Sequence, residues 1–309
     1  MSADADGFEA DNAQVCNVKT SKDIRILVTG ASGQLGSRLM ICAEPRQGIE
    51  MIGMSQDDLD VCDSGAVRKA LELHRPDVVI HTAAYTAVDQ AESEEERALV
   101  VNGHAVGWVA KACASVGASM IHISTDYVFG EVPHRPLQPE DDAQPLSAYG
   151  RTKREGELAF LQSGVNGLVV RVAWLYDAEG KNFLNTMLRL AQTHGSLSVV
   201  NDQHGVPTSV PVFSEALLDL AAQKGDMPQG VWHFAHEGHT TWHGFASEIM
   251  RIANMDVAVE EVGTEAFPTP AKRPSWSVLD GEPLRAKMGW PPIHWKEGLE
   301  RCWELKQDV

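Results

Sequence analysis

Residues 24–36 read IRILVTGASGQLG, a run of mainly apolar, β-forming residues followed by a turn with three glycines. Such a run is typical of a strand buried on both faces of a parallel sheet. Gly30 permits a tight turn, Gly33 lets a pyrophosphate approach the backbone, and Gly36 lets the following helix pack against the strand. The helix N-terminus then offers free N–H groups and a positive dipole end to phosphate. The stretch therefore predicts a dinucleotide-binding βα turn.

Strands and helices alternate after this turn, which predicts right-handed crossovers and an α/β fold with a Rossmann-type, doubly wound parallel sheet. We expect strands at 24–29, 50–54, 59–61, 78–83, 119–124 and 168–172. Helices are expected at about 34–43, 64–73, 93–116 and 149–161. The proline-rich, acidic segment 130–147 is expected to form a loop over the ligand edge of the sheet.

The length of 309 residues favours two domains. After residue 173 the pattern becomes less regular, which indicates a smaller C-terminal α/β domain. We expect a disordered acidic tail over 1–22, an NAD(P)-binding Rossmann domain over 23–173, and a substrate domain mainly over 174–309. The chain is expected to cross back to the first domain around 205–235.

The composition restricts the classes of partner. With 26 basic and 43 acidic residues, the net charge is −17, which disfavours a broad nucleic-acid or membrane surface. No apolar run reaches the roughly 18–20 residues that a membrane span needs. The five cysteines are odd in number and form no CxxC pair. They indicate a reduced, cytoplasmic environment.

Tyr149 and Lys153 form a YxxxK motif at the head of a predicted helix. Residues four apart share one helix face, and a cation near a phenol lowers its pKa from about 10. Tyr149 is then a candidate general acid for a carbonyl oxygen that receives hydride. The motif alone more often marks an exposed Tyr and Lys. It gains weight because Ser124 and Thr125 end a strand shortly before it, at the edge where ligands bind.

Together these motifs resemble the extended short-chain dehydrogenase/reductases, and further segments are similar to the dTDP-4-dehydrorhamnose reductase family. The resemblance runs in order over about residues 24–300. The most specific segments are HTAAYTAVDQAE at 81–92, STDYVF at 124–129, DQHGVPT at 202–208, and PTPA with RP and SVLD between 268 and 280.

The resemblance implies NAD(P)H-dependent reduction of the C4 ketone of a dTDP-6-deoxy-4-keto-hexose, the last step of dTDP-L-rhamnose synthesis. Tyr149 would protonate the oxygen, Lys153 would hold the nicotinamide ribose and lower the tyrosine pKa, and Thr125 would orient the substrate. Cofactor contacts are expected from Gly30, Ser32, Gly33, Gln34, Leu35, Gly36, Asp60, Val61, Ala83, Ala84, Thr86, Tyr149 and Lys153. Substrate contacts are expected from Val88, Thr125, Asp126, Phe129, Trp174 and Arg273.

Several positions leave alternatives open or depart from relatives. The end of the second strand reads Met54-Ser55-Gln56-Asp57, which does not decide between NAD and NADP. Trp174 is equally compatible with a core position. Arg38 stands where relatives with a magnesium-bridged dimer have glutamate, so a homodimer is compatible with the sequence, but no metal site is expected.

Two further sequence features bear on the chemistry. The histidines His233, His236, His239 and His243 span a strand, a turn and a helix start, so we expect them not to share a face. Sugar-nucleotide 4,6-dehydratases have Thr-Asp-Glu after the strand that corresponds to 119–124, whereas this chain has Thr-Asp-Tyr at 125–127. Without the glutamate, carbonyl reduction is simpler than elimination.

The motif set also fits other functions. One alternative is a non-catalytic NADP-binding regulatory subunit that resembles the methionine adenosyltransferase β subunit. The segment Tyr85–Asp89 fits reductases better than that subunit. Another alternative is a reductase or epimerase that acts on a different sugar nucleotide.

Overall fold

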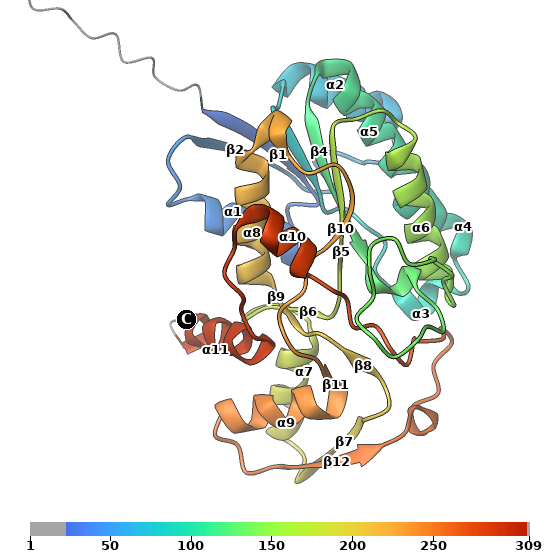
Figure 1. Ribbon diagram of the computed structural model, residues 1–309, viewed down its shortest axis with the longest axis vertical. Coiled ribbons are helices and arrows are strands. Elements are labelled where there is room, and N and C mark those ends of the chain that lie inside the picture. The colour runs from blue at the N-terminus through green and yellow to red at the C-terminus, as the bar shows by residue number, and fades with distance from the viewer. Residues whose placement is uncertain (1–22, 308–309) are drawn as a thin grey trace, which may run out of the picture.

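The computed structural model describes residues 23–307, so the predicted disordered tail over residues 1–22 lies outside the described residues. A parallel sheet with helices on both faces forms one region, and a smaller set of helices and short strands packs at one end of it (Figure 1). This arrangement confirms the predicted α/β fold.

The central sheet has six parallel strands in the order β10-β5-β4-β3-β1-β2. The strands are β1 (Ile24–Thr29), β2 (Ile49–Met54), β3 (Val78–His81), β4 (Ser119–Thr125), β5 (Gly167–Val172) and β10 (Gly230–His233). The chain passes from β1 outward to β2 and then to β3 on the opposite side of β1. Ligands of doubly wound sheets bind at such a reversal, outside the carboxyl ends of the strands. The candidate site is therefore expected above β1 and β3.

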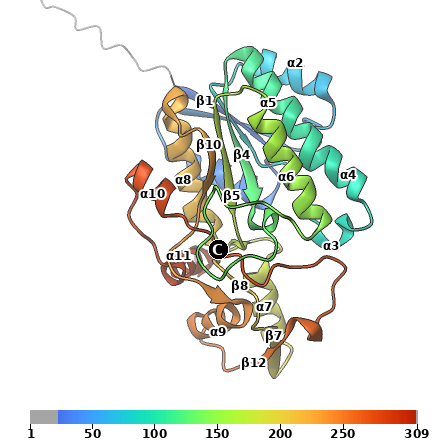
Figure 2. The same ribbon diagram turned by 45° about the vertical axis from the view of Figure 1, so that its right-hand side comes forward.

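Helices cover both faces of the sheet (Figures 1 and 2). One face is covered by α2 (Ser64–His74), α5 (Ala105–Val116) and α6 (Ala148–Leu161), the other by α1 (Gln34–Ala43), α8 (Val210–Ala222) and α10 (Glu282–Met288). Successive strand residues point to opposite faces, so Ile26 and Val28 join the core against α1 and α8, while Leu27 joins the core against α2 and α5. Burial on both faces explains the continuous apolar runs of the strands.

Two predicted elements differ from the structure. The expected strand at 59–61 does not form, because the Ser55 backbone N–H and hydroxyl both donate to Asp58 Oδ2 and close a turn after β2. The expected helix over 93–116 is divided into α4 (Glu95–Leu99), a π-helical turn η1 (Val100–His104) and α5. A short helix α3 (Val88–Ala91) precedes them.

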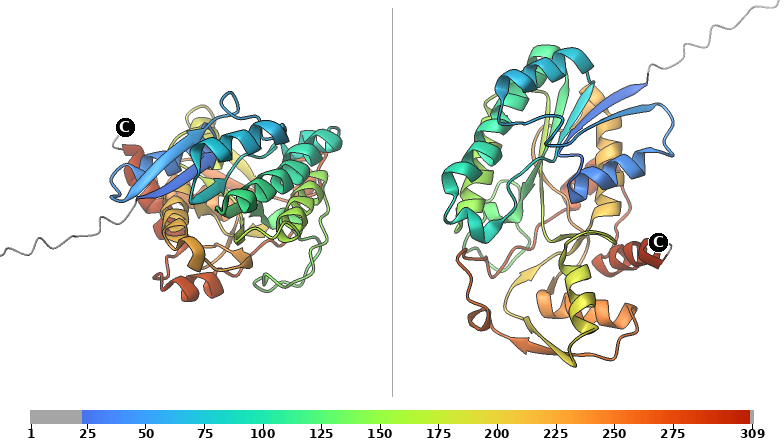
Figure 3. Two further views of the ribbon diagram at one scale, coloured as in Figure 1. Left: turned by 90° about the horizontal axis from the view of Figure 1, so that it is seen from above. Right: turned by 180° about the vertical axis from the view of Figure 1, so that it is seen from behind.

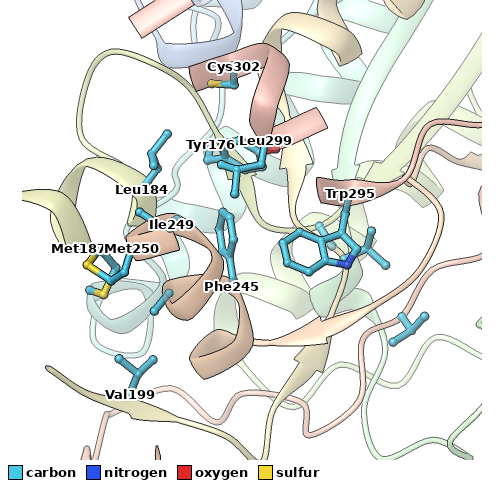
Figure 4. Packing of buried hydrophobic residues seen from close by; sticks show 14 of the residues in the cluster. Tyr176, Leu184, Met187, Val199, Phe245, Ile249, Met250, Trp295, Leu299 and Cys302 are labelled. Carbon is cyan, nitrogen blue, oxygen red and sulfur yellow. The ribbon is translucent and has the colours of Figure 1, made fainter. Parts of the chain in front are cut away.

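The second region comprises α7 (Phe183–Ala191), α9 (Trp242–Ile252), α11 (Trp295–Gln307) and several short strands. The strands pair as β7 (Ser196–Val200) with β12 (Ala258–Val262), β6 (Leu175–Tyr176) with β9 (Thr208–Ser209), and β8 (His204–Gly205) with β11 (Thr240–Thr241). Three 3-10 turns complete the chain: η2 (Asp126–Val128), η3 (Lys224–Asp226) and η4 (Thr264–Ala266). The core of the second region packs around Phe245, with Tyr176, Ile249 and Trp295 close by (Figure 4).

The chain returns to the sheet after its first excursion into the second region. Helix α8 packs against α1, and β10 pairs with β5 at the sheet edge (Figure 3). Helices α10 and α11 were not expected from the sequence pattern. The boundaries of the two predicted domains stay a prediction, although α8 and β10 fall close to the predicted crossing.

A buried ion pair joins the two regions. Arg38 of α1 donates from Nε and Nη2 to the carboxylate of Asp177, just after β6, at 2.9 and 2.8 Å. Both side chains are buried, and the bidentate geometry satisfies both charges. Arg38 therefore anchors the helix that follows the glycine turn to the second region.

Candidate functional site

The glycine turn is a tight backbone structure at the carboxyl end of β1. Gly30 has φ of +70°, and a Cβ there would lie 2.8 Å from the backbone nitrogen of Ala83. A Cβ on Gly36 would overlap the carbonyl oxygen of Gly30. Helix α1 begins after Gly33 without a side-chain cap, so its first N–H groups are open to a ligand. The turn therefore has the cradle that a pyrophosphate requires.

The loop after β3 lies against this turn. The Thr82 hydroxyl donates to the carbonyl of Thr29 at 2.7 Å, and the missing side chain of Gly30 leaves room for Ala83. Ala84 and Thr86 follow in the same loop with partly exposed and exposed side chains. The side-chain amide nitrogen Nε2 of Gln34, the first residue of α1, is buried without a hydrogen-bond partner among residues 23–307. An orphaned donor at this position fits a ligand that accepts hydrogen bonds.

The predicted adenine contacts follow β2. The N–H of Ala31 donates to the carbonyl of Met54 at 3.0 Å, so the end of β2 lies beside the glycine turn. Asp60 is exposed and accepts from the Cys62 N–H at 2.9 Å, whereas Val61 is buried. Their predicted contacts with the cofactor stay predictions.

Tyr149 lies in the first turn of α6, next to the end of β4. Ser147 caps the helix by accepting from the Gly150 N–H at 3.2 Å, and the Tyr149 ring meets Tyr127 edge-on with centroids 5.6 Å apart. Burial raises the pKa of the Tyr149 phenol to about 12, and a hydrogen bond with the Thr125 side chain opposes this shift. The phenol is therefore protonated at neutral pH, as a proton donor must be.

Lys153 lies one turn along α6 and points into the sheet. It is buried, and its ammonium donates to the carbonyl of Ile123 at 2.6 Å. Burial lowers the pKa of Lys153 to about 8, while the charge of Glu157 raises it. We expected Lys153 to lower the phenol pKa, but in this structure Thr125 is the group that does so.

Asp126 is a buried carboxylate beside Thr125. The Thr125 hydroxyl donates to Oδ1 at 3.0 Å, and Oδ2 has no hydrogen-bond partner among the described residues. Burial raises the pKa of Asp126 to about 6, although the hydroxyls of Ser277 and Thr125 lower it. The structure thus brings Thr125, Asp126 and Tyr149 together at the end of β4.

The remaining predicted substrate residues lie in different surroundings. Val88 is partly buried at the start of α3. Phe129 is fully buried, with the Arg171 guanidinium 4.9 Å from its ring centroid, so its side chain faces the core. Arg273 pairs through both Nη atoms with the Asp89 carboxylate, at 3.1 and 2.9 Å. Their roles toward a sugar nucleotide stay predictions.

Trp174 is half-buried and has a backbone φ of +51°. Its indole stacks on Trp242 at the head of α9, with ring centroids 3.6 Å apart and planes 10° from parallel. A Cβ on Gly205 would lie 2.5 Å from the Trp174 ring, so the absent side chain makes room for it. One face of Trp174 is therefore used for packing, and the predicted sugar contact stays open.

Asn102 is a residue of this site that the sequence did not indicate. It lies in the π-helical turn, where its side chain accepts from the Tyr85 N–H at 2.8 Å and donates to the Tyr85 carbonyl at 3.0 Å. The same amide donates to the Thr152 hydroxyl at 3.2 Å. Asn102 therefore ties the loop after β3 to α6. The register change of a π turn leaves no mark in the apolar pattern of residues 93–116.

The described residues contain no group of three or more His, Cys, Asp or Glu side chains placed to hold a metal ion. The four histidines of residues 233–243 have separate partners: His233 contacts Leu137, His236 contacts Ser209, His239 lies by Trp276, and His243 contacts Val259.

Two cavities in the structure lie away from the candidate site. Cavities of 480 and 490 Å³ open beside α8 and beside α7, and neither is lined by a predicted site residue. Within residues 23–307, none of the helices has the length and apolarity that a bilayer crossing needs.

The reversal of strand order beside a glycine turn, with a tyrosine and a lysine at the head of the next helix layer, defines a dinucleotide-binding oxidoreductase of the Rossmann type. The family model described as RmlD substrate binding domain matches residues 24–307, so the chain belongs to that family. The family expected from the sequence is thereby confirmed.

Relatives agree with this membership. A dTDP-4-dehydrorhamnose reductase of Streptomyces griseus is 42% identical over 279 residues, which cover 89% of this chain and 91% of the relative. The crystal structure of a Clostridium acetobutylicum dTDP-4-dehydrorhamnose reductase is 40% identical, with a TM-score of 0.86 over 92% of this chain and 100% of that chain. The Bacillus anthracis reductase in complex with NADP is 35% identical, with a TM-score of 0.87 over 92% and 99%.

Proposed function

We propose that this chain reduces the C4 ketone of a dTDP-6-deoxy-4-keto-hexose with NADH or NADPH, as the last step of dTDP-L-rhamnose synthesis. Membership of the family and relatives named dTDP-4-dehydrorhamnose reductase support the substrate class. A relative in complex with NADP supports the cofactor class. The observation that carries the chemistry is the position of Tyr149 and Thr125 at the ligand edge, next to the end of β4.

The cofactor would lie across the strand reversal. The open N–H groups at the start of α1 and the backbone of Gly30, Gly33 and Gly36 would hold the pyrophosphate. The loop at Ala83, Ala84 and Thr86 would border it, and Lys153 would hold the nicotinamide ribose. When bound, the reduced nicotinamide supplies the hydride.

Tyr149 would protonate the sugar oxygen. A phenol with a pKa of about 12 keeps its proton at neutral pH and gives it up only as negative charge develops on the oxygen. Thr125 accepts from the Tyr127 N–H at 3.2 Å and donates to Asp126, so its hydroxyl has a fixed place beside the phenol. Thr125 would therefore orient the carbonyl for proton transfer.

The triplet Thr125-Asp126-Tyr127 favours reduction over elimination. Tyr127 is a partly buried phenol, and burial raises its pKa above the usual range, so it cannot serve as a base at neutral pH. The residue after Asp126 is therefore not a second carboxylate with which it could share an elimination.

The decisive experiment supplies purified protein with dTDP-4-keto-6-deoxy-hexose and either NADH or NADPH, and follows cofactor oxidation by absorbance. We expect turnover with this nucleotide sugar, and UDP- and GDP-linked 4-keto sugars serve as competitors for the base pocket. A folded protein that binds cofactor but turns over none of these sugars would refute the proposal. Recovery of an adenosyltransferase in a pull-down would then favour a regulatory subunit.

The proposal includes a cytoplasmic location. Cys42, Cys62, Cys113 and Cys302 are free thiols in the structure, which fits a reducing compartment. Fractionation of cells that produce the protein should place it with cytoplasmic markers.

A further inference from the structure

A stripe of polar side chains crosses three strands beneath α6. Thr29 of β1, His81 of β3 and His122 of β4 are register partners, and all three side chains are buried. Thr29 directly precedes Gly30, and His122 precedes Ile123, whose carbonyl accepts from Lys153. The stripe therefore connects the glycine turn with Lys153 through the interior of the sheet.

The imidazole nitrogens of this stripe are largely open. His81 Nδ1 is hydrogen-bonded to the Thr29 hydroxyl at 2.7 Å. His81 Nε2 and both ring nitrogens of His122 have no partner among residues 23–307. A neutral imidazole has one N–H and one lone pair, so His122 offers one donor and one acceptor in either tautomer. Buried polar atoms without protein partners are commonly satisfied by ordered water.

Lys153 faces the same stripe with unused donors. An ammonium has three N–H donors, and the structure pairs one of them, with the Ile123 carbonyl. Burial and then the Lys153 charge lower the pKa of both histidines, that of His81 to about 3. Both rings are therefore uncharged at neutral pH. The other titratable groups around Lys153 are Tyr149 and Glu157, one turn away on either side along α6.

We propose that His81 and His122 are positioning residues for Lys153, and that their open nitrogens hold ordered water against its ammonium. Neutral acceptors would add to the stabilisation that the nearby Glu157 charge gives the ammonium. Lys153 is thereby kept charged and fixed in direction at a buried position. The use of Lys153 for a nicotinamide ribose rests on the proposed function, whereas the water site does not.

A crystal structure of the protein tests the water site directly. We expect density for an ordered water within hydrogen-bond distance of a His122 nitrogen and of the Lys153 ammonium. A site without water, in which the open nitrogens face only apolar groups, would overturn the proposal. This result does not depend on any activity.

Substitution of His122 tests the effect on Lys153. His122→Phe removes both nitrogens at similar size, and His122→Gln keeps a donor and an acceptor. Binding of NADH and of NADPH is followed by fluorescence titration across pH. In the parent protein, affinity should fall as pH rises through the Lys153 pKa of about 8. In His122→Phe the pH at which affinity falls should be about one unit lower, because the loss of the imidazole acceptors favours the uncharged amine. In His122→Gln the affinity should fall at nearly the same pH as in the parent protein.

His236→Phe is the matched control. His236 is also buried, and its Nε2 accepts from the Ser209 N–H at 3.3 Å, beside the cavity at α8. In this variant, cofactor affinity should fall at the same pH as in the parent protein. A folded His122→Phe protein whose affinity falls at the same pH as in the parent protein would contradict the proposal. If His122→Phe does not fold, His81→Gln and the crystallographic water decide it. If the pH dependence of affinity shifts as expected but the protein reduces no sugar nucleotide, the proposed function is refuted and the role of His122 is not.

Discussion

The glycine turn and the head of α6 face the same edge of the sheet, but they are built in different ways. At Gly30 and Gly36 the fit depends on absent side chains, since a Cβ would meet backbone atoms of the neighbouring loop or of the turn itself. At Thr125, Tyr149 and Lys153 the arrangement depends on side-chain polar atoms. In the proposed function, backbone shape at the glycine turn would set pyrophosphate binding, whereas the side chains of Thr125 and Tyr149 would set the chemistry. Substitutions in the two places should therefore fail in different ways.

Tyr149→Phe should give the largest effect and separate the two parts of the site. Loss of the proton donor should reduce turnover by about 100- to 10,000-fold, while cofactor affinity changes little. Steady-state kinetics and a cofactor titration measure the two quantities. Tyr176→Phe is the control, because it removes a buried hydroxyl without a partner from the core of the second region. Equal losses of binding and turnover in Tyr149→Phe would remove the distinction.

Arg38→Ala tests the anchor of the helix after the glycine turn. The substitution leaves the Asp177 carboxylate buried without its partner, which should lower the free energy of unfolding by about 3–5 kcal/mol. Chemical denaturation measures it. Arg46→Ala is the matched control, since Arg46 is more exposed and pairs with Asp219 at 2.7 Å, and its loss should cost about 1 kcal/mol or less. Similar losses for the two arginines would show that Arg38 is not an anchor.

Gly36→Ala should impair folding and cofactor binding together, unlike Tyr149→Phe. The added Cβ would meet the Gly30 carbonyl and Ala31 Cα, so we expect a loss of about 1–3 kcal/mol in stability. Cofactor affinity should fall about tenfold or more if the turn shifts by a few tenths of an ångström. Gly195→Ala, where a Cβ would meet nothing within 4 Å, is the neutral control. A normal cofactor affinity in Gly36→Ala would mean that the turn tolerates movement.

Asp126→Asn should stabilise the protein at neutral pH. A raised pKa means that the folded state disfavours the charged carboxylate, so the cost is present above about pH 6 and disappears as pH falls below the unfolded value near 3.8. The variant should gain about 1–3 kcal/mol at neutral pH and match the parent protein at about pH 3. Thermal unfolding at both pH values tests this. An unchanged stability difference across pH would show that Asp126 is not responsible.

The sequence predicted the elements whose signals are local. The apolar run before Gly30 and the spacing of the glycines are sufficient for β1, the turn and α1, because strand burial and turn geometry depend on adjacent residues. The YxxxK motif likewise placed the head of α6. Leu59 and Val61 were misleading, since their burial comes from packing of a turn rather than from a strand.

Contacts between distant segments could not be read from the sequence. The ammonium of Lys153 turns to the Ile123 carbonyl, Arg38 finds Asp177, and Asn102 joins two segments from a π turn. Each depends on how elements pack, which residue type and spacing do not specify. Phe129 shows the same limit, because its place after Asp126 gave no sign that Arg171 lies under its ring.

The pairing of β10 with β5 has a consequence for synthesis of the chain. The ribosome releases Gly167–Val172 well before Gly230–His233, so β5 has an exposed edge while residues 173–229 emerge. An unpaired parallel edge is a site for wrong pairing with another nascent chain. Until residue 233 has left the exit tunnel the six-stranded sheet lacks β10, and the β5 edge stays open to such pairing.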